Sequence, residues 1–125
     1  MTGNEYQKAA LRTASVNSNL RVVTALKKHG FSDKTVLLLN GVLGLGGESG
    51  ECEDLVKKHL FQGHQLDVEH MAKELGDVAW YLAVTAYAIG YDLDDIFDMN
   101  VKKLLERYPN GFDAKRSLHR KASDI

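Results

Sequence analysis

The chain has 125 residues, 44% of them hydrophobic, which is enough for one compact domain but not for two. Its 16 basic and 17 acidic residues leave a formal charge of −1, too small to hold a nucleic acid polymer by charge alone. The single cysteine, Cys52, excludes an internal disulfide, and residues 1–12 show no secretory signal, so we expect a cytoplasmic protein.

Apolar residues recur at helical spacing along most of the chain, so we predict an all-α fold, an antiparallel helical bundle. Residues 15–30 are ambiguous, because polar residues interrupt an apolar pattern that stops near Gly30. Helix caps are expected at Ser32, Asp67 and Asp92. The predicted helices are residues 4–14, about 33–61, 68–90 and 93–108, in a single domain at 1–112 that precedes a basic tail at 113–125.

Five glycines in the first half of the long predicted helix oppose helical propensity: Gly41, Gly44, Gly46, Gly47 and Gly50. Each costs about 1 kcal/mol relative to alanine in a helix interior. The apolar residues between them keep helical spacing, which favours a helix in which close approach of a neighbouring backbone or ligand offsets the cost. The alternative is that residues 40–47 form a loop.

The run Val78–Tyr91 contains no charged residue, yet it is too short to cross a bilayer as a helix, so no membrane partner is expected. We predict a helix buried on most sides. A small domain rarely supplies that much cover, and we therefore expect a second subunit to complete the core.

Two pairs of carboxylates, Glu48 with Glu51 and Glu74 with Asp77, are each three residues apart, so each pair shares a helical face. Four such groups between two packed helices would repel one another unless cations neutralised them. An all-oxygen ligand set favours Mg²⁺ or Mn²⁺. A di-iron bundle would need two Glu-x-x-His repeats, which are absent, and the histidines are expected at the surface.

A third helix offers groups that suit phosphate. Asn100, Lys103 and Arg107 follow one stripe at spacings of three and four, and could place an amide and two cations against phosphate oxygens. The alternative is a solvated flank.

Four further residues are candidate substrate contacts. Lys57 and Lys58 could reach a phosphate, although Lys57 lies three residues after Asp54 and could equally form an intrahelical ion pair. Trp80 and Tyr81 could stack on a base, but aromatic residues in such a run more often belong to the core.

These segments resemble the MazG-like branch of the all-α nucleoside triphosphate pyrophosphohydrolases. The family signature Glu-x-x-Glu, a spacer and Glu-x-x-Asp is similar to residues 48–51 and 74–77, and its Asn-x-x-Lys-Leu and Arg-Tyr-Pro motifs are similar to residues 100–104 and 107–109. The resemblance implies a homodimer or a tetramer of two dimers. It also implies that Mg²⁺ is bound by four carboxylates: Glu48, Glu51, Glu74 and Asp77. Asn100 and Lys103 would then lie near the metal and the phosphates.

We therefore expect a Mg²⁺-dependent hydrolase acting on acid anhydrides, which converts a nucleoside triphosphate and water to the monophosphate and pyrophosphate. Glu51 would orient the attacking water or accept its proton. Enzymatic alternatives in the same superfamily are a dUTP- or dCTP-specific pyrophosphatase and a phosphoribosyl-ATP pyrophosphohydrolase. The alternative of another class is a non-catalytic, metal-binding helical dimerisation module.

Overall fold

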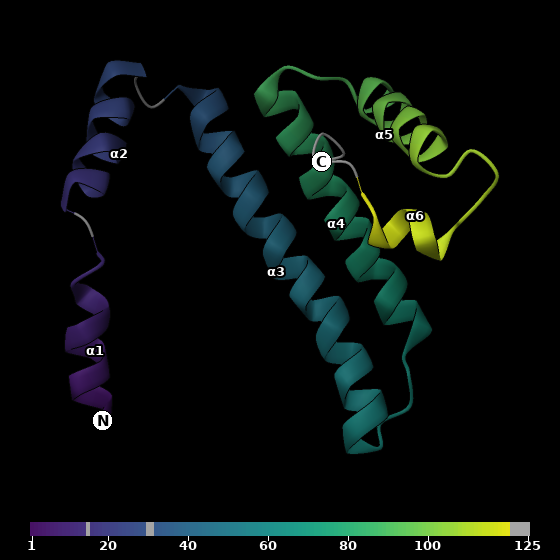
Figure 1. Cartoon of the computed structure of the whole chain (residues 1–125), viewed down its shortest axis with the longest axis horizontal. Helices are drawn as coiled ribbons and strands as arrows, with labels where there is room; N and C mark the ends of the chain where they lie inside the picture. The colour runs from purple at the N-terminus through teal and green to yellow at the C-terminus, as the bar shows by residue number, and fades with distance from the viewer. Residues whose placement is uncertain (15, 30–31, 121–125) are drawn as a thin grey trace. The chain divides into compact units, whose positions relative to one another are not determined.

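The computed structural model of the chain describes residues 1–14, 16–29 and 32–120, and these contain six α-helices and no β-strand (Figure 1). The prediction of an all-α fold is confirmed. The helices, in chain order, are α1 (Gly3–Leu11), α2 (Val16–His29), α3 (Asp33–Gln62), α4 (Val68–Ile89), α5 (Leu93–Arg107) and α6 (Ala114–Leu118).

The chain divides into two compact units, Met1–Val36 and Leu37–Ile125. In the first unit, α1 begins with a capping box. The Glu5 backbone N–H donates to Thr2 Oγ1 at 3.2 Å, and the Thr2 N–H donates to the Glu5 carboxylate at 2.5 Å. The segment that the sequence left ambiguous contains α2; Ser15 and Gly30, at its ends, lie outside the described residues.

The long helix α3 starts at the predicted cap, where the Thr35 N–H donates to Ser32 Oγ at 3.2 Å. It continues through the glycine-rich segment without interruption, so the loop alternative for residues 40–47 does not hold. The glycines therefore lie in a helix interior, where their lack of a side chain carries its full cost.

Two of the five glycines sit where α3 approaches α4. A Cβ atom on Gly41 would meet the side-chain oxygen and the backbone of Thr85, and one on Gly44 would meet the ring of Tyr81. Close approach of a neighbouring helix, as predicted, explains these two positions. Gly46, Gly47 and Gly50 have nothing within 4 Å of such an atom, so packing inside the chain does not explain them.

The helix α4 begins and ends with local signals. The His70 N–H donates to Asp67 Oδ1 at 2.9 Å, as expected of a cap, and Gly90 ends the helix in the left-handed region with φ 82°. The chain then reverses, and α5 returns along α4 (Figure 1). Asp92 takes the predicted N-cap position of α5 with extended backbone, but its side chain makes no capping hydrogen bond.

The described residues bury little apolar surface. Ala86 on α4 is 2% exposed and is their one buried hydrophobic residue, and Glu74 is their one buried charged residue, at 8%. The expectation that α4 is buried on most sides is not met within a single chain, because Trp80, Tyr87 and Ile89 are about half exposed. Within the described residues, no helix combines the length and hydropathy needed to span a membrane.

The basic tail is partly helical. The short helix α6 is capped by Asp113, whose Oδ1 accepts from the Arg116 N–H at 3.1 Å. The Arg116 guanidinium donates to the carbonyl oxygen of Arg107 at 3.4 Å, which joins the tail to the end of α5. Residues 121–125 of the predicted tail lie outside the described residues.

Candidate functional site

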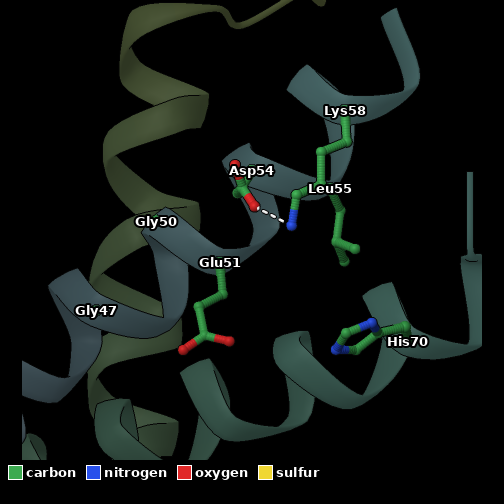
Figure 2. A pocket seen from close by; sticks show the side chains of 7 residues that line it. All are labelled: Gly47, Gly50, Glu51, Asp54, Leu55, Lys58 and His70. Carbon is green, nitrogen blue, oxygen red and sulfur yellow. Dashed lines mark ion pairs between the residues drawn. The ribbon is translucent and has the colours of Figure 1, made fainter. Parts of the chain in front are cut away.

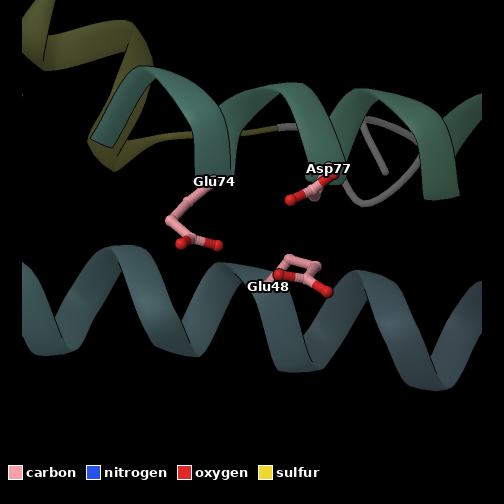
Figure 3. Close-up of side chains that lie close together, drawn as sticks. All are labelled: Glu48, Glu74 and Asp77. Carbon is pink, nitrogen blue, oxygen red and sulfur yellow. The ribbon is translucent and has the colours of Figure 1, made fainter. Parts of the chain in front are cut away.

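Three carboxylates from two helices converge between α3 and α4. Glu48 projects from α3 toward Glu74 and Asp77 on α4 (Figure 3), and one oxygen atom of each lies within 4.8 Å of the other two. Glu74 is buried, Glu48 is half-buried and Asp77 is exposed. This carboxylate cluster is therefore reachable from solvent on the Asp77 side.

The packing of α3 on α4 creates the cluster. Gly44 lets the Tyr81 ring lie against α3, and Glu48 follows four residues later on the same helical face. Tyr81 in turn follows Asp77 by four residues. The contact between Gly44 and Tyr81 therefore sets the distance between Glu48 and Asp77, each of which lies one helical turn away from it.

The electrostatics of the cluster favour a cation. The pKa of Glu48 is raised above its usual value, first by burial and then by the charge of Glu51, a hydrogen bond to Glu74 and the charges of Asp77 and Glu74. Neighbouring carboxylates that disfavour one another's ionisation gain stability when a divalent cation neutralises them. Oxygen donors of this kind suit a hard ion such as Mg²⁺ or Mn²⁺.

The fourth predicted carboxylate, Glu51, is not among the three that converge. It instead lines an adjoining pocket of about 270 Å³ between α3 and the start of α4 (Figure 2). The residues around this α3–α4 pocket are Gly47, Gly50, Glu51, Asp54, Leu55, Lys58 and His70.

His70 connects the pocket to the cluster. Its Nε2 lies 2.7 Å from Glu74 Oε1, so the imidazole holds the one buried carboxylate of the described residues. The histidines are predicted at the surface, and the His70 side chain is half exposed, but its contact with Glu74 does not follow from that prediction. The spacing of four residues between the two was the available signal.

Lys57, a predicted phosphate contact, forms the intrahelical ion pair that was its alternative. Its Nζ lies 2.5 Å from Asp54 Oδ1, and Lys58 Nζ lies 2.6 Å from Asp54 Oδ2. Hydrogen bonds from the two ammonium groups lower the pKa of Asp54 to about 2. Both lysine charges are therefore directed at Asp54.

The aromatic pair of α4 is placed by packing. Tyr81 lies against Gly44, while Trp80 is 54% exposed and meets the Tyr81 ring edge-on, with ring centroids 4.8 Å apart. Neither residue lines the α3–α4 pocket.

Two members of the predicted phosphate stripe on α5, Asn100 and Lys103, are not joined to the cluster by a bond among the described residues. Asn100 and Lys103 are exposed, and in the part of the chain that the structure describes no hydrogen bond or ion pair links them to the three carboxylates. Arg107 is half-buried, with its guanidinium carbon 6.0 Å from the centroid of the Tyr108 ring.

Comparison with known proteins bears on the same segment. Residues 39–112 match the family model described as the MazG nucleotide pyrophosphohydrolase domain, a segment that contains the cluster, the pocket and α5. Gene 37 protein of Mycobacterium phage L5 is 36% identical over 73 residues, or 55% of this chain, and the match spans 64% of that protein's own length. No solved structure is significantly similar to the chain.

Proposed function

This chain belongs to the MazG nucleotide pyrophosphohydrolase family, and from that premise we propose that it is a magnesium-dependent enzyme which hydrolyses nucleoside triphosphates to the monophosphate and pyrophosphate. The observation that carries the proposal is the convergence of Glu48, Glu74 and Asp77 within 4.8 Å inside the matched segment. The charge repulsion evident at Glu48 gives these groups a physical reason to bind a divalent cation.

The residues present fit magnesium. Glu48, Glu74 and Asp77 would hold the ion through carboxylate oxygens, with Glu51 one turn away on α3 as a fourth ligand or as the base. When bound, Mg²⁺ or Mn²⁺ neutralises phosphate charge and makes water easier to deprotonate. His70 keeps the Glu74 carboxylate in place through its ring nitrogen.

Glu51 is the proposed general base. It projects from α3 into the α3–α4 pocket (Figure 2), next to the cluster but outside the three convergent carboxylates. It takes a proton from the attacking water, whose oxygen bonds to phosphorus while the bond between the α- and β-phosphoryl groups breaks and pyrophosphate leaves.

Asn100, Lys103 and Arg107 remain proposed phosphate contacts. Trp80 does not line the α3–α4 pocket, so it would contact a base only if the base lay outside that pocket, along α4. Since Asn100 and Lys103 form no hydrogen bond or ion pair with the cluster among the described residues, we propose that a second copy completes the site in a homodimer or a dimer of dimers. Lys57 would have to leave Asp54 to reach a phosphate, and Tyr81 would have to leave Gly44 to stack on a base.

The test is a panel of ribonucleoside and deoxyribonucleoside triphosphates with Mg²⁺, with products separated by chromatography. We expect monophosphate and pyrophosphate, no turnover with chelator, and a loss of at least about a hundredfold in kcat for Glu51→Gln at unchanged helical content. Orthophosphate as the product, or full activity in Glu51→Gln, would contradict the mechanism.

The same panel separates the alternatives. Activity confined to dUTP or dCTP, or to phosphoribosyl-ATP, would identify one of the narrower pyrophosphohydrolases. Metal and nucleotide binding without any product would identify the non-catalytic dimerisation module.

A further inference from the structure

We propose that the α3–α4 pocket binds the uncharged half of the nucleotide, its base and sugar, while the triphosphate extends to the carboxylate cluster. This inference rests on the proposed function. On this proposal the base and sugar lie on one side of Glu51 and the triphosphate on the other. The proposal also gives a reason for Gly47 and Gly50 in the middle of a long helix.

The pocket is built mainly by one face of α3. Its six residues from that helix recur at spacings of one, three and four, and His70 from α4 closes the other side (Figure 2). The volume of about 270 Å³ is just below the roughly 300 Å³ at which pockets for drug-sized ligands begin. The space is comparable in size with a nucleoside.

The pocket and the cluster are adjacent. His70 lines the pocket and contacts Glu74 of the cluster at 2.7 Å. On α3, Glu51 of the pocket follows Glu48 of the cluster by three residues, a rise of about 4.5 Å along the helix. A phosphate chain attached to a group in the pocket can therefore reach the proposed metal ligands.

The charges around the pocket disfavour a phosphate there. Lys58 is paired with Asp54 at 2.6 Å, and His70 lies 2.7 Å from Glu74. Each basic side chain among the described lining residues thus already contacts a carboxylate and is not available to a phosphate. Carboxylates instead accept hydrogen bonds from sugar hydroxyls and from the amino groups of bases.

The wall of the pocket suits a flat ring. A Cβ atom on Gly47 or Gly50 would meet nothing within 4 Å, so no packing within the described part of the chain requires glycine there, although each weakens the helix by about 1 kcal/mol relative to alanine. A ligand lying against the bare backbone supplies the missing reason. Leu55 and the His70 ring offer apolar and aromatic surface beside it.

The experiment fills the pocket with side chains that favour the helix. Gly47→Ala, Gly50→Ala and Gly50→Leu narrow the pocket, and Gly46→Ala is the matched control, because Gly46 is equally open but does not line it. All four should raise the melting temperature, since each replaces a helical glycine, so any loss of affinity cannot come from unfolding.

We expect Gly50→Leu to raise the KM for nucleoside triphosphates at least about tenfold, with smaller increases for the two alanine variants and a change below about twofold for Gly46→Ala. Inhibition by the nucleoside monophosphate should weaken in parallel, whereas inhibition by inorganic pyrophosphate should not change. An unchanged KM in Gly50→Leu, or weaker inhibition by pyrophosphate, would overturn the inference.

Failure of the proposed function is a separate result. If the wild-type protein turns over no nucleotide, calorimetry with a non-hydrolysable nucleoside triphosphate and Mg²⁺ decides the role of the pocket. Binding that Gly46→Ala keeps and Gly50→Leu loses supports the inference, while equal binding in both variants, or no binding to the wild type, refutes it.

Discussion

At the scale of residues, Glu48 and Asp54 show how one helix can shift two carboxyl groups in opposite directions. Burial and the neighbouring carboxylates raise the pKa of Glu48, whereas two lysine ammonium groups lower the pKa of Asp54 to about 2. The difference follows from the partners that each side chain meets. Glu48 faces acids on α4, whose repulsion an added cation would relieve, and Asp54 already has cations from its own helix.

Asp54 should make stability depend on pH. Its folded pKa is depressed from 3.8, so its ion pairs with Lys57 and Lys58 contribute stability that is complete above about pH 5 and is lost as the pH falls toward 2. We expect wild type to be slightly more stable than Asp54→Asn at pH 7, with a difference that shrinks as the pH falls through about 2.

Thermal unfolding of both proteins between pH 2 and pH 7 measures that difference. High salt should reduce it, because the Asp54 side chain is 36% exposed and surface ion pairs are screened. A difference that grows as the pH falls would contradict the assignment of the ion pairs.

At the scale of elements, the glycines of α3 serve two different surfaces. Gly41 and Gly44 lie against Thr85 and Tyr81 of α4, so there glycine permits close packing of two helices. Gly47 and Gly50 lie one to two turns later and line the α3–α4 pocket, with open space beside them. One glycine-rich sequence therefore both sets the distance between α3 and α4 and leaves room next to the carboxylate cluster.

The two surfaces predict opposite effects of alanine. Gly44→Ala should destabilise the protein by about 1–3 kcal/mol, because a new methyl group would overlap the Tyr81 ring and outweigh the gain in helical propensity. Gly46→Ala should stabilise it by up to about 1 kcal/mol. Urea unfolding of the two variants gives the sign directly.

A second substitution checks the cause. Tyr81→Ala alone should be destabilising, but in its presence Gly44→Ala should no longer carry a penalty, since the ring that it would meet is gone. Equal penalties with and without Tyr81 would show that the helices do not meet at this contact.

At the scale of the whole molecule, the described residues leave much apolar surface uncovered. Along α5, Phe97, Val101, Leu104 and Leu105 recur at helical spacing and are 50%, 54%, 42% and 61% exposed. Apolar stripes of this kind mark surfaces that another protein covers. A second copy of the chain is the partner that we propose, because Asn100 and Lys103 on α5 also form no hydrogen bond or ion pair with the cluster among the described residues.

We expect sedimentation equilibrium at micromolar concentrations to give a dimer or a tetramer, and the melting temperature to rise with protein concentration. Phe97→Glu or Leu105→Glu should weaken association and lower stability together, because each would bury a charge in the interface. A monomer with a melting temperature independent of concentration would contradict this assembly.

The sequence by itself determined the helical class, the cap at Asp67, and which acidic residues share a helical face, because these depend on spacings of three and four residues within one helix. It also identified the family, since the two acidic motifs are local strings. Tertiary structure decided that Glu48 joins Glu74 and Asp77 while Glu51 lines a pocket. That outcome depends on how two helices are rotated against each other, and their rotation is set by contacts such as Gly44 with Tyr81, which no spacing along one helix specifies.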